Sequence, residues 1–91
     1  MIIQDNPKMP LWHEVLIAIQ RTRDRHCYTD RIARRVKCAR GWVRTLVQRL
    51  HQRGLVECIP VGKVKLLKIT QKGEGVVKAI IAMRSELGVF T

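Results

Sequence analysis

The segment from Thr29 to Val56 constrains the fold of this chain more than any other part of the sequence. Two short helical patterns meet within it at residues 37–39. The second pattern ends at Gly54, which supplies the left-handed residue that often follows a helix C-terminus. Apolar residues recur at helical spacing on each side of the meeting point. The segment therefore predicts two short helices, over about 30–36 and 40–53, joined by a tight turn, and Thr29 is expected to cap the first of them.

The same segment carries most of the charge of the chain. The formal net charge is +11 over 91 residues, and between Gln20 and Gly54 eleven Lys and Arg face only two Asp, so this stretch holds nine of the eleven net positive charges. Basic residues often do no more than solvate a helix surface. Their concentration in one segment instead favours an anionic partner: a nucleic-acid backbone, an acidic membrane surface or an acidic protein.

Membrane association is the weakest of these three interpretations. No apolar run approaches the roughly 20 residues that a spanning helix requires, and the first residues lack the charged lead and long apolar centre of a signal peptide. The three cysteines, Cys27, Cys38 and Cys58, are too few for the disulfide framework of a small secreted domain, although a single bridge stays open. We therefore expect a cytoplasmic protein.

The remaining patterns predict three more elements and a single domain. Pro10 suits the first turn of a helix over about 10–23, with an apolar stripe at Leu11, Val15 and Ile19. After Gly54 the period becomes strand-like, and two short strands are expected on either side of a turn at residues 60–62. Thr70 can cap a last helix over about 71–87. Residues 1–9 are expected to form a flexible lead.

Three local motifs occur along this order of elements: Ile32-Ala33, the run LHQRGLV at residues 50–56, and the run LKITQKG at residues 67–73. With these motifs, the mainly α architecture with a small β-hairpin resembles the winged helix-turn-helix family of transcriptional regulators. The similarity is greatest to small bacterial and archaeal regulators of the MarR and ArsR kind. It covers about Leu11–Leu87 and implies a winged helix domain over residues 10–88.

The resemblance implies that the helix over about 40–53 enters the major groove of DNA, where base edges present a distinct pattern of donors and acceptors. With the apolar side chains of this helix turned inward, its outward residues become base-reading candidates: Arg40, Arg44, Thr45 and Gln48. Backbone contacts are expected from Arg31, Arg34, Arg35, Lys37, Gly41, Arg49, Lys63 and Lys65. Two alternatives stay open. Gly41 can be a substitution without functional significance near a frayed helix start, and the lysines on the hairpin can be ordinary protection of a sheet edge.

The last helix has a broader apolar arc than one small domain easily buries. We expect Val76, Ile80, Met83 and Leu87 to form a dimer contact, which would place two recognition helices about one DNA turn apart. The alternative is a monomer whose last helix wraps its own core.

Aromatic and catalytic residues narrow the function further. Trp42 is assigned to the core, with base stacking as the alternative, and the few aromatics provide no platform for single strands. Ser85, the only serine, lies far in sequence from every histidine, so an enzyme is not expected. The cysteine spacings are not those of a zinc site. No cofactor is expected, and a small-molecule or metal effector is possible but unsupported.

The sequence thus predicts a homodimeric, nucleoid-associated regulator that binds double-stranded DNA with sequence preference. The first alternative is a low-specificity architectural or chromatin-like protein, which the high charge favours. Less favoured is an RNA-binding or protein-interaction module built on the same scaffold.

Overall fold

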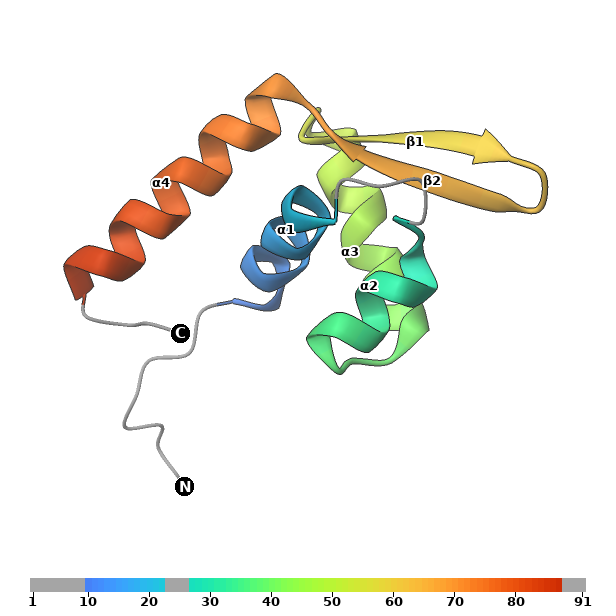
Figure 1. Cartoon of the computed structure of the whole chain (residues 1–91), viewed down its shortest axis with the longest axis horizontal. Helices are drawn as coiled ribbons and strands as arrows, with labels where there is room; N and C mark the ends of the chain where they lie inside the picture. The colour runs from blue at the N-terminus through green and yellow to red at the C-terminus, as the bar shows by residue number, and fades with distance from the viewer. Residues whose placement is uncertain (1–9, 23–26, 88–91) are drawn as a thin grey trace.

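The computed structural model describes residues 10–22 and 27–87 of the chain. Its elements follow the order α1 (Leu11–Arg21), α2 (Thr29–Val36), α3 (Arg40–Gln52), β1 (Val56–Val61), β2 (Val64–Ile69) and α4 (Gln71–Leu87) (Figure 1). This order and the mainly α class with one antiparallel hairpin confirm the predicted architecture. The predicted lead over residues 1–9 lies outside the described residues, and α1 ends at Arg21, two residues before the predicted end.

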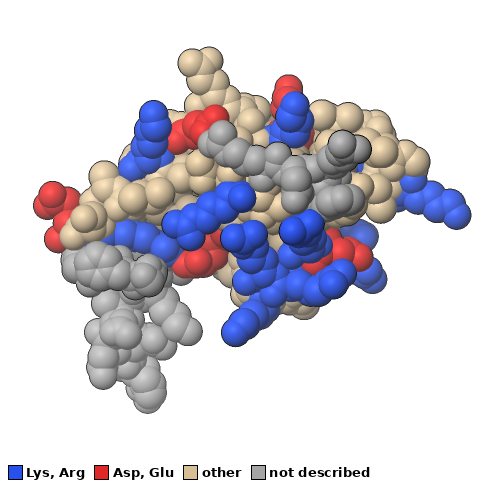
Figure 2. Space-filling view, viewed as in Figure 1, with Lys and Arg blue, Asp and Glu red and all other residues tan. Residues whose placement is uncertain are grey.

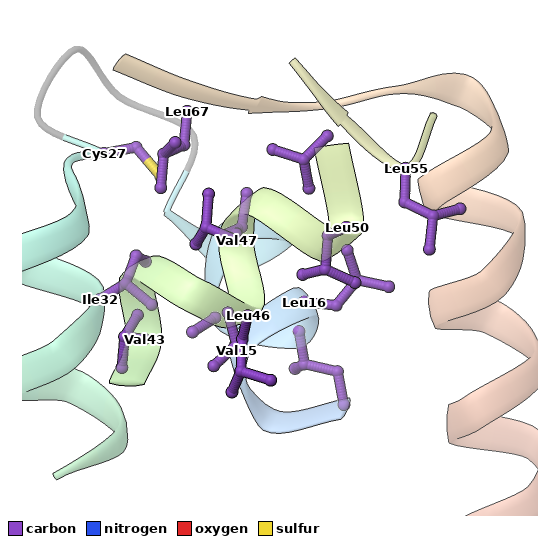
Figure 3. Packing of buried hydrophobic residues seen from close by; sticks show 14 of the residues in the cluster. Val15, Leu16, Cys27, Ile32, Val43, Leu46, Val47, Leu50, Leu55 and Leu67 are labelled. Carbon is purple, nitrogen blue, oxygen red and sulfur yellow. The ribbon is translucent and has the colours of Figure 1, made fainter. Parts of the chain in front are cut away.

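Helix α1 lies at the centre of the fold, between α4 on one side and the α2–α3 pair on the other, while the hairpin projects away from α4 (Figure 1). The sequence of α1 suits this central position, because five consecutive apolar residues are buried and therefore cover all sides of the helix: Val15, Leu16, Ile17, Ala18 and Ile19. They pack against residues of α2, α3 and the hairpin in one continuous core (Figure 3). Among the described helices, none is long and apolar enough to cross a membrane.

A compact joint connects the end of α3 to the start of α4. Gly54 has a φ of 77°, and the amides of Gly54 and Leu55 donate to the carbonyls of His51 and Leu50, which closes the C-terminus of α3 in a Schellman motif. The Thr70 hydroxyl donates to the Gly54 carbonyl at 2.7 Å and accepts from the Gly73 amide at 3.0 Å. The predicted roles of Gly54 as helix terminator and Thr70 as cap are confirmed.

The hairpin turn lies two residues later than predicted. Val61 pairs with Val64, so Gly62 and Lys63 form the two-residue loop, and Pro60 and Val61 belong to β1. Gly62 has a φ of 61°, whereas no positive φ occurs at Lys63, a pattern typical of a type II′ turn. The prediction of a turn at 60–62 was wrong because proline, a turn signal, is also tolerated in an edge strand.

The start of α2 also differs from expectation. Thr29 is the first helical residue and not the cap; Tyr28 occupies the cap position, and its side chain makes no capping hydrogen bond. Tyr28 instead forms a β-bridge with Leu66, and the Leu67 amide donates to the Cys27 carbonyl at 2.8 Å. The chain before α2 is thus attached to the free edge of β2, which positions α2 beside the hairpin.

Candidate nucleic-acid interface

The turn between α2 and α3 is built around Lys37. Its φ of 57° makes it the one non-glycine residue with positive φ in the described chain. The Cys38 amide donates to the Ala33 carbonyl at 3.0 Å and the Lys37 amide to the Arg34 carbonyl at 3.3 Å, so α2 also ends in a Schellman motif. A left-handed conformation costs strain at a residue other than glycine, but the sharp reversal that the predicted helix-turn-helix requires is present.

A wide groove of about 1110 Å³ lies between α2, α3 and the hairpin. The basic side chains that line it come from all three elements: Arg31, Arg34 and Arg35 from α2, Arg44 from α3, and Lys63 and Lys65 from the hairpin. Residues more than thirty positions apart in sequence therefore meet on one concave surface. Figure 2 shows Lys and Arg side chains gathered over the part of the molecule where α2 lies. A concave surface lined mostly by positive charge concentrates the field that attracts a polyanion.

The predicted base-reading residues divide into two pairs. Arg44 and Gln48 are exposed and line the groove. Arg40 and Thr45 have partners within the protein: Arg40 Nη1 donates to Asp30 Oδ2 at 3.1 Å, and Thr45 Oγ1 donates to the Gly41 carbonyl at 3.2 Å. The outward geometry of α3 is therefore as expected, but Arg40 and Thr45 are not free as the sequence suggested.

The predicted backbone contacts also separate by position. Besides the five in the groove, Lys37 lines a second, shallower hollow together with Arg34 and Arg40. Gly41 is exposed, and a Cβ at this position would meet nothing within 4 Å, so space remains for a phosphate to approach the backbone. Arg49 is exposed but does not line the groove. The Arg35 guanidinium donates to the buried Thr22 hydroxyl at 3.1 Å, which ties α2 to the end of α1.

Several groove residues were missed from the sequence, and three of them bear on the chemistry of the site. Tyr28 reaches the groove through its bridge to β2, which no local pattern indicated. Cys58 also lines it, and burial raises the pKa of the Cys58 thiol, with Lys65 acting in the opposite direction. Asp30 is the third, and it is the single acidic residue among those that line the groove within the described chain. A charge count along the segment could have singled it out, because acids are scarce there.

Helix α4 places the predicted dimer residues on different surfaces. Ile80 is buried in the core of its own domain, so it is not available to a partner and has to be removed from the predicted set. Val76 is half-buried, and Met83 is 41% exposed. The side chain of Leu87 lies outside the described residues. The exposed Val76–Met83 flank is what remains for an intersubunit contact.

A polar cluster joins α1 to α4 on the other side of the domain. Arg84 on α4 forms an ion pair with Glu14 on α1. His13 is buried beside them, and its ring packs edge-on against Trp12 with the centroids 4.1 Å apart. Burial and the nearby Arg84 lower the pKa of His13, and Glu14 opposes them. Within residues 10–22 and 27–87, no three His, Cys, Asp or Glu side chains lie close enough together to hold a metal ion.

Comparison with solved structures identifies the architecture. AF1382 of Archaeoglobus fulgidus superposes with a TM-score of 0.75 at 22% identity, over 84% of this chain and 86% of that one. MepR, a transcription regulator of the Staphylococcus aureus multidrug efflux pump MepA, gives a TM-score of 0.77 at 17% identity, over 85% and 58%. The chain has the winged helix fold of MarR-type regulators. In that fold α3 is the second helix of the helix-turn-helix, and the hairpin that follows it is the wing.

The winged helix similarity extends to a protein whose DNA binding is regulated by a small acid. Bordetella bronchiseptica BpsR, whose DNA binding is regulated by 6-hydroxynicotinic acid, has a TM-score of 0.78 at 19% identity, over 94% of this chain and 62% of its own. MepR has also been solved bound to an oligodeoxyribonucleotide. The chain thus spans about three fifths of the length of MepR and BpsR. No protein-family model and no curated protein sequence matches it.

Proposed function

We propose that this winged helix protein is a transcriptional regulator that binds double-stranded DNA with sequence preference. The observation that carries the proposal is the convergence of six basic side chains from α2, α3 and the wing on one groove. Arg44 and Gln48 would meet base edges in the major groove, where Arg pairs with guanine and Gln with adenine. Lys63 and Lys65 on the wing would contact the backbone or minor groove. With a duplex partner, the protein would lie on the nucleoid in the cytoplasm.

The remaining predicted contacts keep their assigned targets in this proposal. Arg31, Arg34 and Arg35 would hold phosphates flanking α3, which fixes register without reading sequence. Lys37, Gly41 and Arg49 would contact phosphates at the ends of the recognition helix. The oligonucleotide complex of MepR supports this arrangement, because the two proteins share a fold.

A homodimer completes the proposed regulator. The Val76–Met83 flank of α4 is apolar and partly exposed, and a two-fold contact through it would space two recognition helices by about 34 Å. Such a dimer would favour a nearly palindromic site. Met83→Glu should convert the dimer to a monomer in sedimentation experiments. Ile81→Glu is the matched variant, because Ile81 is similarly exposed but lies on the other flank of the helix and should leave the dimer intact. A wild-type chain that sediments as a monomer at all concentrations would exclude this contact.

One observation favours an architectural protein as a second candidate. Of the four predicted base-reading residues, Arg40 and Thr45 have partners inside the protein, whereas the basic residues positioned for phosphates are many. Binding that rests on phosphates is independent of sequence and strongly dependent on salt. Selection of bound sites from a random duplex pool at about 0.15 M salt separates the two functions. A regulator should enrich a defined motif, and recovery of unenriched DNA would refute the regulator.

Arg44→Ala tests the recognition helix directly. The change should cost about 1–3 kcal/mol on the selected site and relax preference at one base pair. Arg49→Ala is the matched control, since Arg49 is exposed on the same helix and lies outside the groove. It should weaken all duplexes alike. Equal losses of Arg44→Ala on the selected and random duplexes, measured by fluorescence anisotropy, would reduce Arg44 to a phosphate contact.

A further inference from the structure

Asp30 occupies an unexpected position for an acid in a surface that would bind DNA. It lies in the first turn of α2, and it lines both the main groove and the shallower hollow beside Lys37 and Arg40. Among the described residues that line these two hollows, no other is acidic. A carboxylate there repels phosphates from the place where the remaining charges attract them, so by itself it weakens binding of any nucleic acid.

The contact that Asp30 makes points to its role. Asp30 Oδ2 accepts from Arg40 Nη1 at 3.1 Å, across the turn that joins α2 to α3. The two side chains are 55% and 62% exposed, and exposed ion pairs add little to folding stability. A contribution to folding stability therefore does not explain why this pair is present. Its effect is to restrict the directions that Arg40, the first residue of α3, can take.

Arginine can be fixed in this way and still recognise a base. The guanidinium has five N–H donors in a rigid plane, so contact with Asp30 through Nη1 leaves other donors for the O6 and N7 atoms of guanine. A phosphate, in contrast, competes with Asp30 for the positive charge as a whole. The pair thus keeps Arg40 away from the sequence-independent contacts that dominate non-specific binding, while it leaves base recognition possible.

From this geometry we propose that Asp30 is a positioning residue that orients Arg40 toward a guanine edge and withholds it from the DNA backbone. The proposal rests on the proposed function, because it requires a duplex site with base preference. It restores Arg40 to the base-reading set despite its ion pair, and it assigns Asp30 a contribution to specificity rather than to affinity.

The decisive experiment compares base-preference profiles from random duplex pools for the wild type, Arg40→Gln, Asp30→Asn and Asp30→Glu. Arg40→Gln should remove preference for guanine at one position of the motif. Asp30→Asn should reduce preference at that same position, whereas Asp30→Glu, which retains a carboxylate within reach of Arg40, should restore it. If Asp30 were only a repulsive charge with no positioning role, the base-preference profile of Asp30→Asn would equal that of the wild type. That outcome would overturn the proposal.

Salt dependence supplies an independent measurement. If Asp30→Asn releases Arg40 to a phosphate, the binding constant of the variant for random duplex should fall by an additional factor of about 3.5 between 50 and 200 mM salt, since one added phosphate contact contributes a slope of about 0.9. The double variant Asp30→Asn with Arg40→Gln should show no such increase over Arg40→Gln alone. An increase that persists in the double variant would show that Asp30 acts on the DNA directly and would overturn positioning.

Matched controls separate this proposal from the proposed function. Glu57→Gln removes the same charge from the face of the hairpin opposite Cys58 and should change neither the profile nor the salt slope. Far-UV circular dichroism of Asp30→Asn checks that α2 persists, because an acid in the first turn also favours the helix. A wild type that binds no duplex refutes the proposed function. One that binds duplex without base preference overturns both, and one with preference that Asp30→Asn leaves intact overturns only the role of Asp30.

Discussion

Two glycines in α4 give opposite predictions for the same substitution. Gly73 lies at the start of the helix, where an added Cβ would collide with the Leu55 carbonyl oxygen and approach Ile69 Cγ1 to 2.7 Å. Gly75 lies two residues further along the same helix, and a Cβ there would meet nothing within 4 Å. Gly73→Ala should therefore destabilise the fold, and Gly75→Ala should stabilise it.

The magnitude of the Gly73 effect follows from the contacts of the joint. The nearest obstructing atom is the backbone carbonyl oxygen of Leu55, so α4 has to move, which costs about 1–3 kcal/mol for an overpacked site. The movement also disturbs the bonds from the Thr70 hydroxyl to Gly54 and from the Thr70 amide to the Leu55 carbonyl, at about 1 kcal/mol each. Replacing a helical glycine by alanine returns about 0.5–1 kcal/mol. The net loss should be about 2–4 kcal/mol, whereas Gly75→Ala should gain about 0.5–1 kcal/mol.

Urea unfolding followed by circular dichroism at 222 nm measures both changes. Each variant is unfolded at several protein concentrations, so that loss of a dimer is not mistaken for loss of folding stability. For a domain of this size, the Gly73 change corresponds to a drop in melting temperature on the order of 10–25 °C. Equal stability of Gly73→Ala and Gly75→Ala would refute the close approach of α4 to Leu55, and with it the steric account of the glycine in the LKITQKG motif.

The other predictions concern the turn, the α1–α4 cluster and the wing. Lys37→Gly should raise the free energy of unfolding by about 1 kcal/mol, because glycine adopts the left-handed conformation without strain, and unchanged stability would contradict the φ assigned to Lys37. Since the pKa of His13 is lowered in the fold, the unfolded chain binds this proton more readily, so stability should decrease as the pH falls below about 6.5. The decrease should be smaller in His13→Gln, and identical pH profiles for the two proteins would exclude His13 as its source. Lys63→Ala should weaken selected and random duplexes equally and reduce the magnitude of the salt slope by about 0.9, whereas a loss confined to the selected site would place Lys63 at a base.

The elements were largely predictable because their signals are local. The apolar stripes fixed α1 and α3, Gly54 marked the end of α3, and Thr70 marked the start of α4. The hairpin turn was misplaced because Pro60 is compatible with both a turn and an edge strand, and only pairing across the sheet distinguishes them. Local chemistry sets where helices begin and end, but register is decided by a partner strand.

The candidate site was only partly predictable because it depends on tertiary neighbours. The groove position of Arg44 follows from the inward face of α3. The partner of Arg40 does not, since Asp30 lies ten positions earlier on another helix. The sequence did not show that Ile80 is buried. The apolar residues of α4 cover a broad arc, and the sequence pattern alone could not divide them between core and surface. Trp42 was assigned to the core but is 46% exposed, because its position on α3 falls at the margin of the buried face.

The joint at Gly54 and Leu55 has a mechanical consequence. The residues that directly follow α3 are linked to the start of α4 by the Thr70 bonds, by Lys72 Nζ, which donates to the Arg53 carbonyl at 3.1 Å, and by the contact that only a glycine at 73 permits. With so many short links, this corner is stiff and does not act as a hinge. A torque applied at the start of α4 should therefore be transmitted to the C-terminal end of α3.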